Sequence, residues 1–307
     1  MLSDKLTDIT ANNSSPDFLL FAQHGWADRG EDISKLAQAL ATTNTHLVVP
    51  SLGIVKTFIS IEPLVEQVEK LAIEAINNYP ETPLRIMGHS MGGLIWLEVL
   101  DRHPEWWHKV HSLVTIGSPI GGSDVARIID PFNIGIGTAK DLGKNRRPLA
   151  EKIAQHIPSL SIASDLNAGS DGLVTVECSK FAYCKFVLIS GIRHAALKCH
   201  PRIVPIIQEF WANPQIESSS NTDLATKVIQ HLQSVPGMTD ASYKDIKRSR
   251  VKIIFADGTT LSTWNNLLGI SHVFVTDKQE KCLYAGYVGW PHATGLAKAI
   301  DELRSTP

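Results

Sequence analysis

The chain has 307 residues, of which 43% are hydrophobic and 20% charged, so it can form a large buried core and a smaller second domain. Its 29 Lys and Arg residues and 31 Asp and Glu residues give a formal net charge of -2, which excludes an overall positive field for nucleic acid. Residues 1–18 lack the features of a signal peptide, and no run is apolar enough to span a bilayer. We expect a soluble, cytoplasmic protein without a nucleic-acid partner or transmembrane segment, with peripheral membrane contact and oligomeric state left open.

The cysteines Cys178, Cys184, Cys199 and Cys282 form no CxxC pair and no zinc-binding spacing with histidine. They are therefore predicted to be reduced thiols, and no metal or organic cofactor is expected. Only Cys178 and Cys184 bracket one short segment, and these two would pair only in an oxidising compartment.

The first two thirds of the chain alternate short apolar runs with amphipathic stretches. We predict strands at 18–25, 45–50, 83–90, 111–119, 159–164 and 184–191, and helices at 31–41, 59–80, 91–103 and 202–211. Strands that are apolar throughout and alternate with helices are typical of a parallel sheet covered on both faces. The predicted fold class is therefore α/β.

The amino-acid composition changes after Trp211. Residues 212–223 are small, polar and rich in Ser and Asn, as linkers are. Beyond them we predict helices at 224–235 and 293–303 and antiparallel strands within 251–264 and 272–289, with turns at "DG" and "TDKQ". The alternating positions Val251, Ile253 and Phe255 predict one buried sheet face. We expect a domain of residues 1–217 followed by a small α+β accessory domain of residues 221–307.

The stretch "MGHSMGG" at residues 87–93 places Ser90 between Gly88 and Gly92, after an apolar strand and before a helix. In a G-x-S-x-G turn the glycines let the chain fold sharply enough to expose the serine hydroxyl, and the following N–H, here that of Met91, binds an oxyanion. This context favours a nucleophile over a serine that only occupies a turn.

The partners that such a serine needs follow in the expected chain order. His24 and Gly25 end the first strand, where the N–H of Trp26 would join that of Met91 in an oxyanion hole, with His24 itself in a structural role. Two residues are candidates for the acid that pairs with the histidine: Asp171, in a glycine-flanked turn, and Asp165, at a strand end.

A histidine base is offered by His194, in a loop between the last core strand and helix. His200 precedes a proline and is expected to cap that helix, and His89 is expected to pack beside the nucleophile.

Residues 18–211 resemble α/β-hydrolases of the lipase and esterase kind, including the bacterial lipase and GPI-inositol-deacylase-like groups. The resemblance rests on "QHGW", "MGHSMGG", "VTIGSPIGGS", "SDGLVTVECS" and "RHAALKCHPRIV". It implies the catalytic triad Ser90, Asp171 and His194, with an α/β-hydrolase core. The implied function is a serine hydrolase that cleaves carboxylic esters through an acyl-enzyme. An acyltransferase, a thioesterase and a non-catalytic binding protein are the alternatives.

Residues 124–158 lie where this fold carries a cap or lid, and their modest apolar runs favour a small-molecule or lipid-like acyl ester as substrate. Within them, "KNRR" at residues 144–147 is expected to be a solvated charge run, with binding of an anionic headgroup as the alternative. Because every motif precedes residue 212, we expect residues 1–217 to retain turnover of a small ester.

Overall fold

The computed structural model describes residues 15–25, 28, 30–53, 60–122, 138–166, 169–218 and 223–305. Its strands are β1 (Phe18–Gln23), β2 (Thr45–Val48), β3 (Leu84–His89), β4 (Val110–Ile116), β5 (Ser159–Asp165), β6 (Cys184–Ser190), β7 (Thr239–Asp240), β8 (Arg250–Ile254), β9 (Thr260–Asn265), β10 (Ser271–Thr276) and β11 (Cys282–Val288). Its α-helices are α1 (Glu31–Leu40), α2 (Glu62–Asn78), α3 (Met91–Arg102), α5 (Thr138–Gly143), α6 (Arg147–Ala154), α7 (His194–Leu197), α8 (Ile203–Ala212), α9 (Leu224–Gln233) and α10 (Ala293–Arg304). Short 3-10 turns are η2 (Pro104–Lys109), η3 (Glu177–Ser179), η4 (Tyr243–Arg248) and η5 (Trp290–His292).

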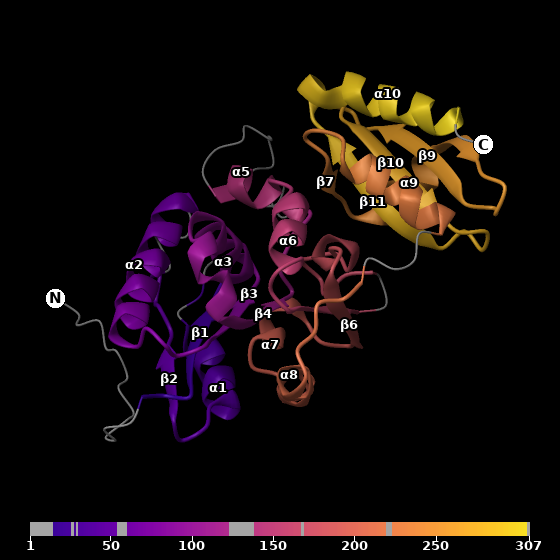
Figure 1. Cartoon of the computed structure of the whole chain (residues 1–307). Coiled ribbons are helices and arrows are strands. Elements are labelled where there is room, and N and C mark those ends of the chain that lie inside the picture. The colour runs from indigo at the N-terminus through magenta and orange to yellow at the C-terminus, as the bar shows by residue number, and fades with distance from the viewer. Residues whose placement is uncertain are drawn as a thin grey trace.

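The first six strands form one sheet in the order β2-β1-β3-β4-β5-β6, and every neighbouring pair runs parallel. Helices α2, α3 and α6 lie on one face of this sheet, and α1, α7 and α8 lie on the other (Figure 1). The six strands lie at the predicted positions, and the predicted parallel sheet covered on both faces is confirmed.

Two hydrophobic clusters explain why these segments adopt this arrangement. Val65, Val68 and Ala72 lie on the inner stripe of α2 and are buried with the apolar residues of α3. On the opposite face, residues of α1 and α8 pack on strand residues such as Leu20 and Ile162. Because β1, β3 and β4 each contribute side chains to both clusters, apolar residues occur on both of their faces. In β5, Ser159 and Ser161 alternate with Leu160 and Ile162, which belong to the second cluster only.

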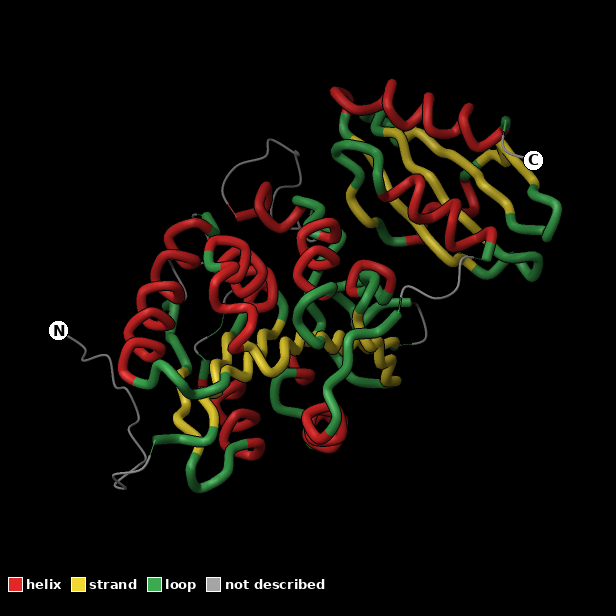
Figure 2. The backbone as a smooth tube through the Cα atoms, viewed as in Figure 1, coloured by secondary structure: helices red, strands yellow, loops and turns green. Residues whose placement is uncertain are grey.

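The last five strands form a second, antiparallel sheet in the order β7-β11-β10-β9-β8. Figure 2 shows this sheet (yellow) with helices α9 and α10 (red) beside it, apart from the larger parallel sheet. The helices bury one sheet face through Val228, Leu232 and Leu296, which join Val273 and Val275 in a cluster of their own. The α+β architecture predicted for this C-terminal unit is therefore present.

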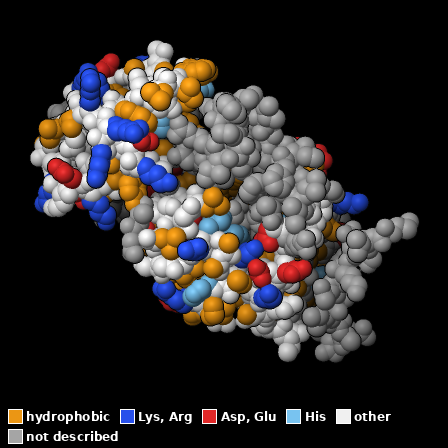
Figure 3. Space-filling view, turned by 180° about the vertical axis from the view of Figure 1, so that it is seen from behind, with side chains coloured by type: hydrophobic (Ala, Val, Ile, Leu, Met, Phe, Trp, Pro, Cys, Tyr) orange, Lys and Arg blue, Asp and Glu red, His pale blue; other side chains and the backbone are white. Residues whose placement is uncertain are grey.

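One detail of that prediction is wrong. Val251 is 58% exposed, whereas Ile253 and Phe255 pack partly on the buried cluster. A register shift between Val251 and Ile253 adds one residue to β8, and such a bulge places the residues before it on the opposite face. Exposed hydrophobic side chains are correspondingly visible on this unit, at the upper left of Figure 3.

Candidate active site

Ser90 occupies the turn between β3, which ends at His89, and α3, which begins at Met91. Its backbone has φ 55 and ψ -126, a conformation that L-residues rarely adopt, so the turn is strained. A Cβ on Gly88 would lie 2.4 Å from the Gly93 nitrogen, and one on Gly92 would lie 2.3 Å from the Gln23 carbonyl oxygen. Only glycine fits at either position, which is why the serine is bounded by glycines.

The side chains of Ser90, His194 and Asp171 form one continuous chain of hydrogen bonds. His194 Nδ1 lies 2.7 Å from Asp171 Oδ2, and His194 Nε2 lies 3.0 Å from Ser90 Oγ. Because a carboxylate only accepts, Nδ1–H is the donor to Asp171. In the neutral imidazole Nε2 is then unprotonated and accepts from the Ser90 hydroxyl, which is the arrangement that proton removal from a serine requires.

Asp171 is held in place by its own loop. Its Oδ1 accepts hydrogen bonds from the backbone N–H groups of Leu173 at 3.0 Å and Val174 at 2.7 Å, which leaves Oδ2 for His194. The side chain is 2% exposed, so few waters compete for it. Asp165, the other acid left open by the sequence, instead accepts from the Gly169 N–H at 2.7 Å. Of the two acids, the structure brings Asp171 to the histidine.

His194 begins the short helix α7, and its position is fixed from two sides. Its backbone N–H donates to the Asp171 carbonyl at 3.0 Å, and its own carbonyl accepts from His89 Nε2 at 3.0 Å. The His89 and His194 rings also lie 4.8 Å apart, centre to centre. Burial lowers the pKa of His89 well below its usual value, so His89 is a neutral donor. The sequence suggested only a packing role for His89, but the side chain also donates a hydrogen bond to the His194 carbonyl.

The predicted oxyanion donors are only partly described by the structure. Met91 is the first residue of α3, where the N–H has no acceptor within the helix. Trp26 lies outside the described residues. His24 is fully buried, and its Nε2 accepts from the Leu52 N–H at 3.0 Å, so its Nδ1–H donates to the Gly25 carbonyl at 2.9 Å. His24 thus braces the turn after β1, a structural role.

His200 does not join the site. Its Nδ1 accepts from the backbone N–H of Arg202 at 3.2 Å, immediately before α8, as expected for a residue at a helix start. Within the predicted cap of residues 124–158, residues 124–137 lie outside the described residues. The remainder forms α5 and α6, and Ala150 and Ile153 of α6 are buried in the cluster that also contains α3.

The expectation of a solvated charge run at residues 144–147 is wrong for its two arginines. Lys144 is exposed, but the side chains of Arg146 and Arg147 are 1% and 6% exposed. Arg146 donates from Nε to Glu98 at 2.7 Å, and Arg147 pairs with Asp240 of the C-terminal unit. Nothing in the local sequence distinguishes these arginines from surface ones, because their partners lie far along the chain.

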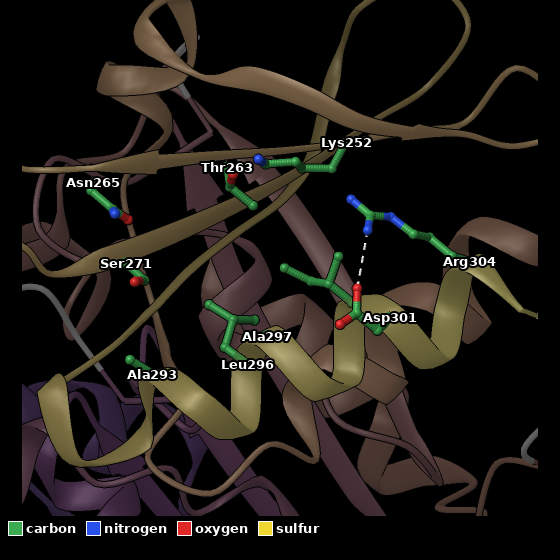
Figure 4. A pocket seen from close by; sticks show the side chains of 10 residues that line it. Lys252, Thr263, Asn265, Ser271, Ala293, Leu296, Ala297, Asp301 and Arg304 are labelled. Carbon is green, nitrogen blue, oxygen red and sulfur yellow. Dashed lines mark hydrogen bonds and ion pairs between the residues drawn. The ribbon is translucent and has the colours of Figure 1, made fainter.

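A cavity of about 230 Å³ lies in the C-terminal unit, between α10 and the strands β8, β9 and β10. Figure 4 shows Asp301 and Arg304 joined in an ion pair at one end, with Leu296 and Ala297 on the helix side and Lys252 on the strand side. None of the predicted site residues lines it.

All four cysteines are free thiols. Within the described ranges, no group of three His, Cys, Asp or Glu side chains is placed to hold a metal ion. In the same ranges, no helix combines the length and the hydropathy needed to cross a membrane.

Comparisons with known proteins agree with the fold and with the turn that contains Ser90. A family model described as Hydrolase_4, serine aminopeptidase S33, matches residues 14–134, which include Ser90 and its turn but neither Asp171 nor His194. A search of curated proteins found no match.

Solved structures that share the fold include two forms of one lipase. The mature form of the Bacillus licheniformis lipase BlEst2 is 13% identical, with a TM-score of 0.51, and the match covers 66% of this chain and 95% of that one. The propeptide form of the same lipase is 14% identical, with a TM-score of 0.52, and covers 92% of this chain and 70% of that one. The core therefore has the α/β-hydrolase fold, and residues 14–134 are similar to the Hydrolase_4 family.

Proposed function

We propose that this protein is a serine hydrolase that cleaves carboxylic esters, with Ser90, His194 and Asp171 as its catalytic triad. The observation that carries the proposal is the unbroken hydrogen-bond chain from Asp171 Oδ2 through His194 to Ser90 Oγ, at a strained turn between strand and helix. Structural serines in turns need neither the strain nor an imidazole 3.0 Å away.

In the proposed reaction, Ser90 Oγ attacks the ester carbonyl carbon while His194 Nε2 takes the hydroxyl proton. Asp171 keeps the imidazole in the required tautomer and stabilises the imidazolium that forms. His194 then gives the proton to the leaving alcohol, and an acyl-enzyme remains on Ser90. Water, deprotonated by His194, attacks this acyl-enzyme, releasing the acid and regenerating the serine hydroxyl.

The oxyanion of each tetrahedral intermediate is proposed to accept hydrogen bonds from the backbone N–H groups of Met91 and Trp26. The Met91 N–H is suited to this because it is the first in α3, adjacent to the nucleophile, where the helix dipole also favours negative charge.

The proposed substrate is a small-molecule or lipid-like acyl ester of medium chain length. Acyl transfer to an alcohol and thioester cleavage use the same residues and are the alternatives within the enzyme class. A binding protein that keeps the fold without its chemistry is the alternative outside it.

The experiment that tests the function combines a fluorophosphonate probe with p-nitrophenyl esters of increasing acyl length. We expect stoichiometric labelling and steady hydrolysis that is greatest at medium acyl length and unaffected by EDTA. An aminoacyl p-nitroanilide serves as the amide control. Absence of both labelling and ester turnover in folded protein would leave the binding-protein alternative.

We further propose that the chain divides into a catalytic domain, residues 1–217, and a C-terminal domain, residues 221–307. In support, the two hydrophobic clusters of the parallel sheet contain only residues before 212, and the two of the antiparallel sheet contain only residues after 223.

A further inference from the structure

Arg147 and Asp240 form a buried ion pair between the parallel-sheet core and the C-terminal unit. Arg147 Nη2 lies 2.5 Å from Asp240 Oδ2, and the two side chains are 6% and 1% exposed. The Tyr284 hydroxyl donates to the other carboxylate oxygen of Asp240 at 2.9 Å. Burial alone would lower the pKa of Arg147, but the Asp240 carboxylate raises it above that of an ordinary arginine. A charged guanidinium buried in the core thus has its paired carboxylate in the other unit.

The same guanidinium holds residues 169–180, which we call the acid loop because they include Asp171. Arg147 Nε donates to the Lys180 carbonyl at 2.8 Å, and Nη2 donates to the Glu177 carbonyl at 3.2 Å. Without Asp240, the buried guanidinium would lose its paired carboxylate, and keeping the charge buried beside these carbonyls would cost more free energy. The position of Arg147, and with it the end of the acid loop, therefore depends on the C-terminal unit.

Residues 117–122, the exit segment after β4, connect this ion pair to the candidate active site. At one end, a Cβ on Gly117 would lie 3.3 Å from both Asp171 Oδ2 and His194 Nδ1. At the other end, the Gly121 carbonyl accepts from the Asp240 N–H at 3.2 Å, and a Cβ on Gly121 would lie 2.3 Å from Asp240 Oδ2. Such a short segment transmits a shift at one end to the other.

The exit segment and the acid loop are also bonded to each other, since the Gly121 N–H donates to the Cys178 carbonyl at 2.9 Å. A second contact comes from Tyr243 of the C-terminal unit, whose ring fills the space where Gly169 of the acid loop would carry a Cβ, 2.6 Å from Tyr243 Cε1. Core glycines thus make room for C-terminal side chains at both segments.

We propose that Asp240 is a positioning residue of the active site: through Arg147 and Gly121 it fixes the acid loop and the exit segment against Asp171 and His194. The C-terminal unit is then a working part of the site, and truncation of the chain after residue 217 would impair turnover. This differs from the expectation from the sequence, in which the C-terminal domain is accessory and not needed for turnover of a small ester.

The test replaces Asp240 by asparagine in the full chain, which keeps the shape and the acceptor for Tyr284 but removes the charge. Hydrogen exchange is measured by peptide, and kcat and KM are measured per active site titrated with fluorophosphonate. We expect exchange in residues 117–122 and 169–180 to quicken at least tenfold, with kcat reduced about tenfold and KM nearly unchanged. Asp301→Asn, which removes a carboxylate paired on the surface of the same unit, is the matched control and should change neither.

If Asp240→Asn does not fold, Tyr284→Phe decides, because it removes only the hydroxyl that bonds Asp240 and should give the same pattern at smaller amplitude. Exchange that quickens evenly over the whole core, or only within residues 223–305, would overturn the proposal. The kinetic part rests on the proposed hydrolase function, but the exchange pattern does not. A wild-type protein without esterase activity would therefore overturn the function and leave the positioning role to be decided by exchange alone.

Discussion

Two groups of buried, hydrogen-bonded polar side chains lie near the two ends of residues 117–122, and they differ in how the sequence encodes them. The Ser90–His194–Asp171 chain joins residues 104 and 23 positions apart, and the Arg147–Asp240 pair joins residues 93 positions apart. Both are long-range contacts. Only the first is marked by local patterns, with a glycine-bounded serine, a glycine-flanked aspartate and a histidine that follows a strand.

The difference has a physical cause. In this fold Ser90 lies on a strained turn, and close backbone contacts demand glycine two residues to either side, so the requirement is visible in seven residues. An ion pair between two units needs only that both charges are buried together. The predictions below for Asp171, for Arg147 and Asp240, and for Ser90 test whether the first group carries the chemistry and the second supports it.

Among the residues that support the nucleophile, the largest effect is expected at the acid. Asp171→Asn should reduce kcat/KM by about 10⁴-fold, because an amide at this position no longer selects the imidazole tautomer that accepts the serine proton. Asp165→Asn is the isosteric control, since its oxygen still accepts from the Gly169 N–H, and it should change kcat/KM little. The reverse ranking in ester hydrolysis would assign the acid to Asp165.

The next effect is on stability rather than chemistry. Arg147→Met and Asp240→Asn, made singly, should each lower the free energy of unfolding, and Asp240→Asn by roughly 3–5 kcal/mol because it leaves a buried cation unpaired. The double variant should recover much of this loss, because no unpaired charge remains. Urea unfolding of the four proteins gives the coupling; additive losses would mean that the two charges do not depend on each other.

A smaller effect on turnover is expected at His89. His89→Leu should reduce kcat by roughly 10²-fold with KM little changed, because the His194 carbonyl loses its donor and the imidazole is less well placed. His89→Gln, whose side-chain amide donates from nearly the same position, should restore most of the rate. Equal activity of the leucine and glutamine variants would reduce His89 to a packing residue.

The smallest effects concern pH. Burial is the largest cause that lowers the pKa of His24, His89 and His111, the last to about 4. Below about pH 6.5 the histidines of the unfolded chain bind protons, whereas the same histidines in the native state stay neutral. Their contribution to the free energy of unfolding is therefore fully present above that pH and is lost as the pH falls. The slope should approach about 1.4 kcal/mol per pH unit for each fully buried histidine.

Urea unfolding at pH 7.5 and 5.5 measures this slope. His111→Asn should make it shallower, by less than the full amount because His111 is only partly buried, and His108→Asn, at an exposed position, should not change it. A slope unaffected by His111→Asn would show that the acid sensitivity arises elsewhere.

Much of the fold follows from the sequence, because parallel strands buried on both faces leave uninterrupted apolar runs such as residues 18–22. The positions of Ser90, Asp171 and His194 were predictable because local patterns mark them. Ser90 and Asp171 lie in turns that contain glycine, and His194 follows the end of a strand. The bulge that exposes Val251 was not, because it depends on pairing with β9. Nor was the burial of Arg147, whose partner in β7, a two-residue strand, has no recognisable pattern.

The central claim is that Ser90 is the nucleophile, and mapping the covalent adduct tests it most directly. After reaction with a fluorophosphonate, peptide mass spectrometry should place one adduct on Ser90 in the wild-type protein. Ser90→Ala should carry no adduct and lose about 10⁴- to 10⁶-fold in ester turnover while its circular dichroism and unfolding transition stay unchanged. An adduct on another serine, or near wild-type turnover by folded Ser90→Ala, would contradict the account.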